Sequence, residues 1–252
     1  MPDYMNAQIT GYFIVFCRLG AMLMLMPAVG DENIPPQVRL IFGLLLTLII
    51  YPTVLMILPA MPTTFPGVAA LIISETLVGL MIGAAARILF SSIQLTGTII
   101  SVQSGLSAAM VFDPTQGAQT VLLGRFVAML AVVLLFVTEM HHLLLGGMAR
   151  SYALFKPGDA FMAGDFAALV VRLLSQSFEI GLQLAAPFLV YGLIFNVGLG
   201  LLSRLTPQIQ VFFIAQPLGI LLSMGLLLAT LGLMMTMFLS RYGDAMRSFL
   251  VG

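Results

Sequence analysis

The residues of this chain that could do chemistry are the few titratable side chains inside long apolar stretches. Charged groups within a membrane are costly, and they usually pair with one another or mark a path for ions or protons. No segment concentrates carboxylates around a shared cavity, as a proton-driven carrier requires. We therefore favour structural pairing between helices over a relay. The intramembrane charges considered for pairing are Arg18, Glu75, Arg87, Arg125, Glu139 and Glu179.

A metal site is the next chemistry to weigh, because Glu139, His141 and His142 have side chains that bind metal ions. Adjacent histidines point to different faces of a helix, the spacing is not that of an HExxH motif, and the chain has no third histidine. The single cysteine, Cys17, also excludes an intramolecular disulfide and a multi-cysteine centre. We predict no metal ion and no cofactor.

Catalytic motifs are absent from the sequence as well. It contains no G-x-S-x-G turn that would present a nucleophilic serine and no GxxxxGK[ST] loop that would hold the phosphates of a nucleotide. The sequence therefore predicts a protein that is not an enzyme and that hydrolyses no ATP.

The composition defines the environment of the chain. Of its 252 residues, 60% are hydrophobic and only 8% are charged, with a formal net charge of +0. A soluble domain carries about 25% charged residues, so this surface must be buried in lipid or against other apolar proteins. A neutral chain also lacks the basic surface that binds nucleic acid.

Long apolar stretches predict an all-α, polytopic membrane protein, because about 20 apolar helical residues cross the hydrocarbon core of a bilayer. Two stretches are too long for a simple span, so several helices are expected to be broken or folded back as hairpins; one break is expected near Pro187. A polar loop is predicted at 146–165. The six expected segments are 9–26, 38–58, 68–100, 121–145, 166–202 and 218–239.

The stretch 101–120 differs from its surroundings. Its sequence, SVQSGLSAAMVFDPTQGAQT, is rich in serine, glutamine, glycine and alanine and carries one charge, Asp113. Non-helical backbone at membrane depth is tolerated only where protein buries it or water lines it. We expect a re-entrant element or one that faces a lumen.

Small residues at helical spacing indicate close helix packing. Gly79 and Gly83 form a GxxxG step, which lets two helix backbones approach each other. Packing within the chain is the commoner use of such a step, and contact with another subunit is the alternative.

The order and spacing of four segments resemble the FliR family of the flagellar type III export apparatus, called SctT in virulence secretion systems. The resemblance covers nearly the whole chain, and its central GLSAAMVFDP stretch is more similar to the flagellar branch. The four segments are FCRLGAMLMLMPAVGDENIPPQVRL, TGTIISVQSGLSAAMVFDPTQG, the histidine pair with SYALFKPG, and LLSRLTPQIQVFFIAQPLGILL.

The resemblance implies a non-enzymatic export-gate subunit in a bacterial inner membrane. Such a subunit assembles with FliP and FliQ into a closed conduit for unfolded flagellar proteins and contacts FlhB. It lies in the flagellar basal body, partly raised towards the periplasm. Residues 1–252 would form one helical domain, in which 1–200 are FliP-like and 201–252 are a FliQ-like hairpin.

The resemblance also implies a plug across the conduit, which falls on Gln103, Gly105, Leu106, Met110, Phe112, Asp113 and Pro114. Separately, polar residues and prolines interrupt two apolar runs at 204–217, and we expect a hairpin turn with subunit contacts there. The expected subunit contacts are Arg204, Pro207, Gln208 and Gln210, besides Gly79 and Gly83. The alternatives are an export-gate subunit of a virulence secretion system, a transporter of small solutes that acts alone, and a purely structural membrane scaffold.

Overall fold

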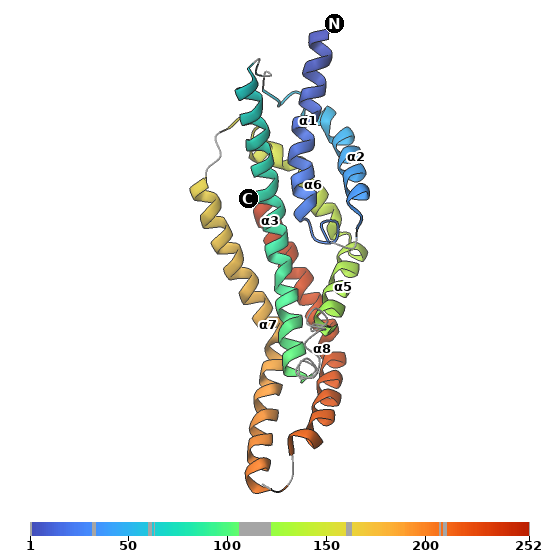
Figure 1. Cartoon of the computed structure of the whole chain (residues 1–252), viewed down its shortest axis with the longest axis vertical. Coiled ribbons are helices and arrows are strands. Elements are labelled where there is room, and N and C mark those ends of the chain that lie inside the picture. Colours follow the sequence, from blue (N-terminus) through green and yellow to red (C-terminus); the bar gives the residue numbers. More distant parts are fainter. Residues whose placement is uncertain are drawn as a thin grey trace. The chain divides into compact units, whose positions relative to one another are not determined.

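The computed structural model describes residues 2–31, 34–59, 62, 64–105, 122–159, 163–206, 208 and 211–251, and the regular structure in these ranges is entirely helical (Figure 1). Its helices are α1 (Pro2–Leu25), α2 (Pro36–Val54), α3 (Phe65–Gln103), α5 (Leu122–Val137), α6 (Met140–Leu154), α7 (Ala163–Leu205) and α8 (Val211–Val251).

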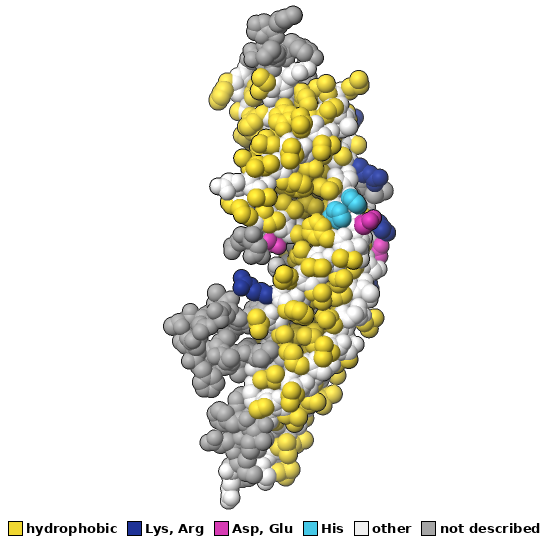
Figure 2. All heavy atoms as spheres, turned by 90° about the vertical axis from the view of Figure 1, so that its right-hand side faces the viewer, with side chains coloured by type: hydrophobic (Ala, Val, Ile, Leu, Met, Phe, Trp, Pro, Cys, Tyr) yellow, Lys and Arg dark blue, Asp and Glu magenta, His cyan; other side chains and the backbone are white. Residues whose placement is uncertain are grey.

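The predicted fold class, an all-α polytopic membrane protein, is confirmed. Within the described ranges, five helices are long and apolar enough to cross a bilayer, and α5 with α6 forms a sixth, bent candidate. Apolar side chains dominate the face shown in Figure 2, where charged side chains are few.

The helices contribute to two compact units, and neither unit is a continuous piece of chain. The first unit comprises residues 1–89, 139–174 and 244–252, and the second comprises 90–138 and 175–243. The helices α3, α7 and α8 each supply residues to both.

In the first unit, α1 and α2 pack together through small and aromatic side chains. The hydroxyl of Tyr12 donates to the Leu44 carbonyl oxygen at 2.7 Å, and Gly43 lets the ring of Phe16 approach the α2 backbone. The helix α2 begins at Pro36, a residue that suits the first turn because it needs no intrahelical donor there.

A tight turn after α1 folds the chain back on the end of that helix. The amide of Gly30 donates to the Met26 carbonyl oxygen at 2.8 Å. A Cβ at residue 30 would collide with the Met24 carbonyl oxygen, so this turn requires glycine.

The second unit has a core of apolar side chains from α3, α5, α7 and α8. Phe90 meets Phe238 and Tyr242 in edge-to-face ring contacts, with centroids 5.9 and 6.4 Å apart. On another face of α3, the hydroxyl of Thr96 donates to the Gly181 carbonyl oxygen at 3.1 Å. The missing side chain at Gly181 is what admits α3 so close to α7.

The overlong segments are continuous helices, and the predicted break near Pro187 is wrong. The helix α7 runs for 43 residues through Pro187, and α3 runs for 39 residues. A proline in a membrane helix removes one backbone hydrogen bond, but neighbouring helices and local adjustment accommodate the change.

The break occurs instead in the predicted segment 121–145, which is two helices. The helix α5 ends at Val137, and Glu139 takes a left-handed backbone conformation (φ 58°) before α6 begins. The prediction of a polar loop at 146–165 is therefore also wrong over its first part. Residues of α6 are buried at the spacing of one helix face, and this stripe is Leu144, Gly147, Met148, Ser151 and Tyr152.

Candidate functional site

Arg18 and Glu75 form a buried ion pair within the first unit. Nε of Arg18 lies 2.6 Å from one carboxylate oxygen of Glu75, and Nη2 lies 2.8 Å from the other. The two side chains are 0% and 1% exposed. This bidentate geometry gives the strongest form of an arginine–carboxylate hydrogen bond, and it joins α1 to α3.

The same arginine also holds the end of α6. Its Nη1 donates to the carbonyl oxygens of Ser151 and Phe155 at 3.1 and 2.9 Å, and its guanidinium carbon lies 4.2 Å from the centre of the Tyr152 ring. A cation at the C-terminus of a helix is favourable because the last carbonyl groups carry partial negative charge. Arg18 thus connects three helices of the first unit.

Gly79 and Gly83 are buried against α1 of the same chain. A Cβ on Gly79 would collide with the Arg18 carbonyl oxygen, and one on Gly83 would lie 2.8 Å from the Met22 carbonyl oxygen. The GxxxG face is therefore occupied within the chain, and no space remains there for a helix of another subunit.

The other intramembrane charges have different surroundings. Arg87 pairs with Asp31 at 2.5 Å in a partly exposed position. Glu179 accepts a hydrogen bond from Gln183 at 3.0 Å. Arg125 is exposed. None of the six predicted charges besides Arg18 and Glu75 forms an ion pair with another member of that set among the described residues.

At the start of α6, Glu139 and His142 are exposed and His141 is half-buried. His142 lies 3.9 Å from the Glu139 carboxylate, with both side chains largely in solvent or lipid, and the rings of His141 and His142 have centroids 4.2 Å apart. Within the described ranges, no three histidine, cysteine, aspartate or glutamate side chains come close enough to hold a metal ion.

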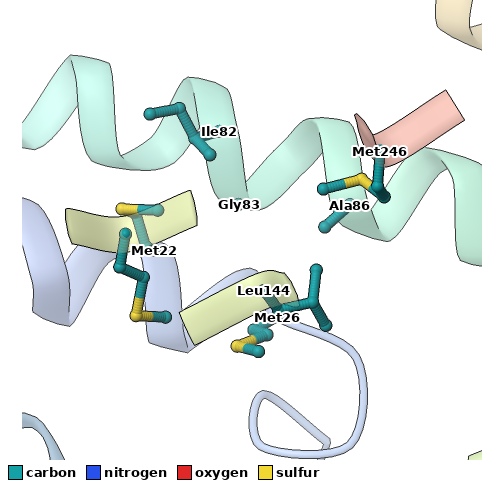
Figure 3. Close-up of a pocket in the computed structure, with 8 residues that line it drawn as sticks. Met22, Met26, Ile82, Gly83, Ala86, Leu144 and Met246 are labelled. Atoms are coloured by element: carbon teal, nitrogen blue, oxygen red, sulfur yellow. The ribbon is translucent and has the colours of Figure 1, made fainter. Parts of the chain in front are cut away.

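A small cavity lies among methionine and aliphatic side chains of the first unit (Figure 3). Its wall includes Met22 of α1, Met26 just after that helix, Ile82 of α3, Leu144 of α6 and Met246 of α8. Its volume of about 20 Å³ suits one water at most, and an apolar cavity of this kind stays dry. It is a packing gap, which flexible methionine side chains tolerate.

Gln103 and Gly105 are the two predicted plug residues that the structure describes; Leu106, Met110, Phe112, Asp113 and Pro114 lie outside the described residues. Gly105 follows the end of α3 with a left-handed backbone (φ 76°). Its carbonyl oxygen accepts a hydrogen bond from Nε2 of Gln216 in α8 at 2.8 Å. Gln103 rests against the backbone of Gly192 in α7.

The helices on either side of residues 106–121 also touch each other. A Cβ on Gly97 of α3 would collide with the backbone of Gly124 near the start of α5. Two glycines thus bring the helix before this stretch and the helix after it into backbone contact within the second unit.

Of the predicted subunit contacts near the connection from α7 to α8, Arg204 and Gln208 are exposed. Pro207 and Gln210 lie outside the described residues.

Sequence reasoning missed two partners in these contacts. Asp31 stands in a loop, where a charge needs no special explanation. Gln216 is a single polar residue directly before Pro217 in an apolar stretch. Neither has a local signal, because each contact joins residues more than 50 positions apart.

An all-α chain with several bilayer-length helices, charges paired between them and glycine contacts at helix crossings is a polytopic integral membrane protein. Its residues 9–245 match the family described as bacterial export proteins, family 1, and the chain belongs to that family.

Relatives over nearly the full length confirm the predicted membership in the FliR family. The flagellar biosynthetic protein FliR of Caulobacter vibrioides is 38% identical over 97% of this chain and 100% of its own length. FliR of Bacillus subtilis is 32% identical over 84% of this chain and 82% of its own length. FliR of Escherichia coli is 31% identical over 88% of this chain and 84% of its own length. These relatives are named as biosynthetic proteins and not as enzymes.

Proposed function

We propose that this chain is a non-enzymatic subunit of a flagellar type III export gate in the bacterial inner membrane. With FliP and FliQ it forms a gated conduit for unfolded flagellar proteins, and it contacts FlhB. The assembly lies in the basal body and is partly raised towards the periplasm. Residues 1–200 are the FliP-like portion, and 201–252 provide the FliQ-like end.

The observation that carries this proposal is the length of the exposed apolar face on α7. Exposed apolar residues extend over about 40 Å of helix axis, whereas the hydrocarbon core of a bilayer is about 30 Å thick. If α7 stands close to the bilayer normal, part of this face lies outside the hydrocarbon core, and that part would be buried against protein partners. The face comprises Phe178, Leu182, Val190, Leu193, Ile194, Val197, Leu201, Leu202 and Leu205.

A groove between α7 and α8 supports the same proposal. It has a volume of about 630 Å³, and its wall includes Val190, Ile194, Leu221 and Gly225. A Cβ at Gly225 would meet no atom within 4 Å, unlike one at Gly79. Such an open small-residue position suits the approach of another helix.

In this proposal the stretch around Gln103, Gly105, Leu106, Met110, Phe112, Asp113 and Pro114 plugs the conduit. Glycines in the stretch allow rearrangement at low steric cost, and Leu106, Met110 and Phe112 exclude water and ions from the closed state. Support comes from the left-handed turn at Gly105, at which the chain leaves α3.

The test is the conductance of the purified complex with FliP and FliQ in a planar lipid bilayer in KCl. Deletion of residues 105–112 is expected to leave assembly intact and to open an ion leak. A second variant replaces Leu106, Met110 and Phe112 by serine, which preserves the chain length and removes the apolar side chains. If both complexes assemble and conduct no more than the unmodified one, the plug assignment is wrong.

The subunit contacts proposed near Arg204, Pro207, Gln208 and Gln210 have a separate test. Replacing Gln208 and Gln210 by glutamate is expected to reduce co-purification with FliP and FliQ, because unpaired charges are costly in an interface. Gln94→Glu is the control, since Gln94 is exposed on α3 and lies outside the exposed apolar face of α7. Undiminished co-purification of the double variant would remove these residues from the interface.

A further inference from the structure

The hydrogen bond between Gln216 and Gly105 crosses 111 positions of sequence and joins the end of α3 to α8 within the second unit. The last carbonyl groups of a helix have no partner in the helix itself. The chain beyond α3 turns through a hydrogen bond from the Gly105 amide to the Val102 carbonyl oxygen at 3.1 Å. The carbonyl oxygen of Gly105 then points to Gln216, which supplies its donor.

The contact with Gln216 requires glycine at residue 105. Gly105 has a φ of 76°, a conformation that is costly for residues with a side chain. A Cβ at this position would also lie 2.7 Å from Nε2 of Gln216. Residue 105 must therefore lack a side chain, both for its backbone and for the approach of the amide.

Neighbouring contacts hold the same end of α3. The side chain of Gln103 rests on the backbone of Gly192, and the hydroxyl of Ser104 donates to the Ser101 carbonyl oxygen at 3.0 Å. Gln216 is the residue of this set that binds the last described position, Gly105.

We infer that Gln216 is a positioning residue, which fixes the direction in which the chain leaves α3 by donating a hydrogen bond to the Gly105 carbonyl oxygen. This rests on the proposed function, because the chain beyond Gly105 is the proposed plug. Loss of the donor frees the end of α3 and weakens the closed seal without altering the helices themselves.

The first experiment measures the contact directly, by hydrogen–deuterium exchange of the assembled complex. Gln216→Met has a similar length and no donor, whereas Gln216→His retains an N–H at a similar reach. Gln94→Met is the matched control, because Gln94 is exposed on α3. Gln216→Met is expected to raise amide exchange in peptides that contain residues 102–105 by about two- to tenfold, the effect of losing one ordinary hydrogen bond.

Exchange in α1 should stay unchanged, and Gln216→His and Gln94→Met should behave like the unmodified complex. If Gln216→Met fails to assemble, Gln216→Leu is measured in its place, because it also removes the donor and leaves the backbone of Gly105 unchanged. Unchanged exchange at residues 102–105 in the variant that assembles would overturn the inference.

The second experiment measures bilayer conductance of the same complexes in KCl, beside the deletion of residues 105–112. The expected result is a leak in the deletion and a smaller leak in Gln216→Met, with rescue by Gln216→His. A leak in the deletion alone overturns the role of Gln216 and leaves the proposed function intact. No leak in either complex overturns the plug, and the role of Gln216 with it.

Discussion

Arg18 of α1 and Glu75 of α3 form a bidentate ion pair whose two side chains are withdrawn from the surface of the protein. The carbonyl oxygen of this same Arg18 touches Gly79, one helical turn after Glu75. Side chain and backbone of a single residue therefore fix how α1 and α3 pack in the first unit.

Removing one partner of this pair should destabilise the protein strongly. Arg18→Ala or Glu75→Ala leaves a buried charge without its counter-charge, which typically costs about 3–5 kcal/mol. Arg18→Ala also removes the donor to the carbonyl oxygens of Ser151 and Phe155 at the end of α6. We expect a large fall in the thermal unfolding temperature of the detergent-purified protein.

The double variant Arg18→Met with Glu75→Leu separates charge from packing. It should be more stable than either alanine variant, because it buries no unpaired charge. Arg87→Ala is the control, since the pair of Arg87 with Asp31 is partly exposed and exposed pairs contribute about 1 kcal/mol or less. Equal losses in the Arg18 and Arg87 variants would contradict the importance of burial.

Gly79→Ala should destabilise the packing of α1 against α3, although it adds only one methyl group. The added methyl group collides with backbone atoms of Arg18, which cannot rotate away as a side chain can. We expect the helices α1 and α3 to separate and the unfolding temperature to fall. Gly232→Ala is the control, because a Cβ there meets nothing within 4 Å and alanine favours the helix by about 1 kcal/mol. A tolerated Gly79→Ala would show that this contact is not tight.

Gly97→Val should disturb the crossing of α3 and α5 in the second unit. The branched side chain would occupy the space of the Gly124 backbone, so the two helices must move apart. We expect a loss of unfolding temperature and increased proteolysis between residues 103 and 122 in the assembled complex. Gly146→Val is the matched control, since a Cβ at residue 146 meets no atom within 4 Å and this position lies outside the proposed subunit contacts. Identical cleavage of both variants would show that the backbone contact between Gly97 and Gly124 does not hold the two helices together.

The exposed face of α7 should affect assembly more than the stability of the isolated chain. Leu193→Gln changes a side chain that is 68% exposed, whereas Leu184 is 2% exposed. We expect Leu193→Gln to change the free energy of unfolding of the isolated protein by no more than about 0.5 kcal/mol and to reduce co-purification with FliP and FliQ. Leu184→Gln should unfold the chain itself. Normal co-purification of Leu193→Gln would place lipid on this part of α7.

The sequence was a good guide wherever the physical signal is local. Long apolar stretches give bilayer-length helices because backbone groups in lipid must bond within the helix. The end of α1 (Leu25) and the start of α2 (Pro36) lie close to the predicted bounds 26 and 38, whereas α1 begins earlier than predicted, at Pro2, and α2 ends earlier, at Val54. The signal failed at α6, where Gly146, Gly147 and Arg150 resemble a loop. The buried stripe through Leu144, Met148 and Tyr152 makes this segment a helix.

Proline also misled the prediction. Pro187 removes one donor from α7, yet the helix continues, whereas the break falls at Glu139, which has no breaking residue beside it. The expectation that proline breaks a helix considers only one lost backbone hydrogen bond. Whether a helix continues depends on all the packing contacts along it.

By itself, the sequence determined the environment and the class of this protein, because 60% hydrophobic and 8% charged residues require burial in an apolar medium. It also identified the charges that need a partner. Only the tertiary structure decided which of them pair: Arg18 with Glu75, and Arg87 with Asp31. It likewise decided that Gln216 meets Gly105. The reason is geometric, since a hydrogen bond acts over about 3 Å, and only the packing of helices brings residues so distant in sequence within that range.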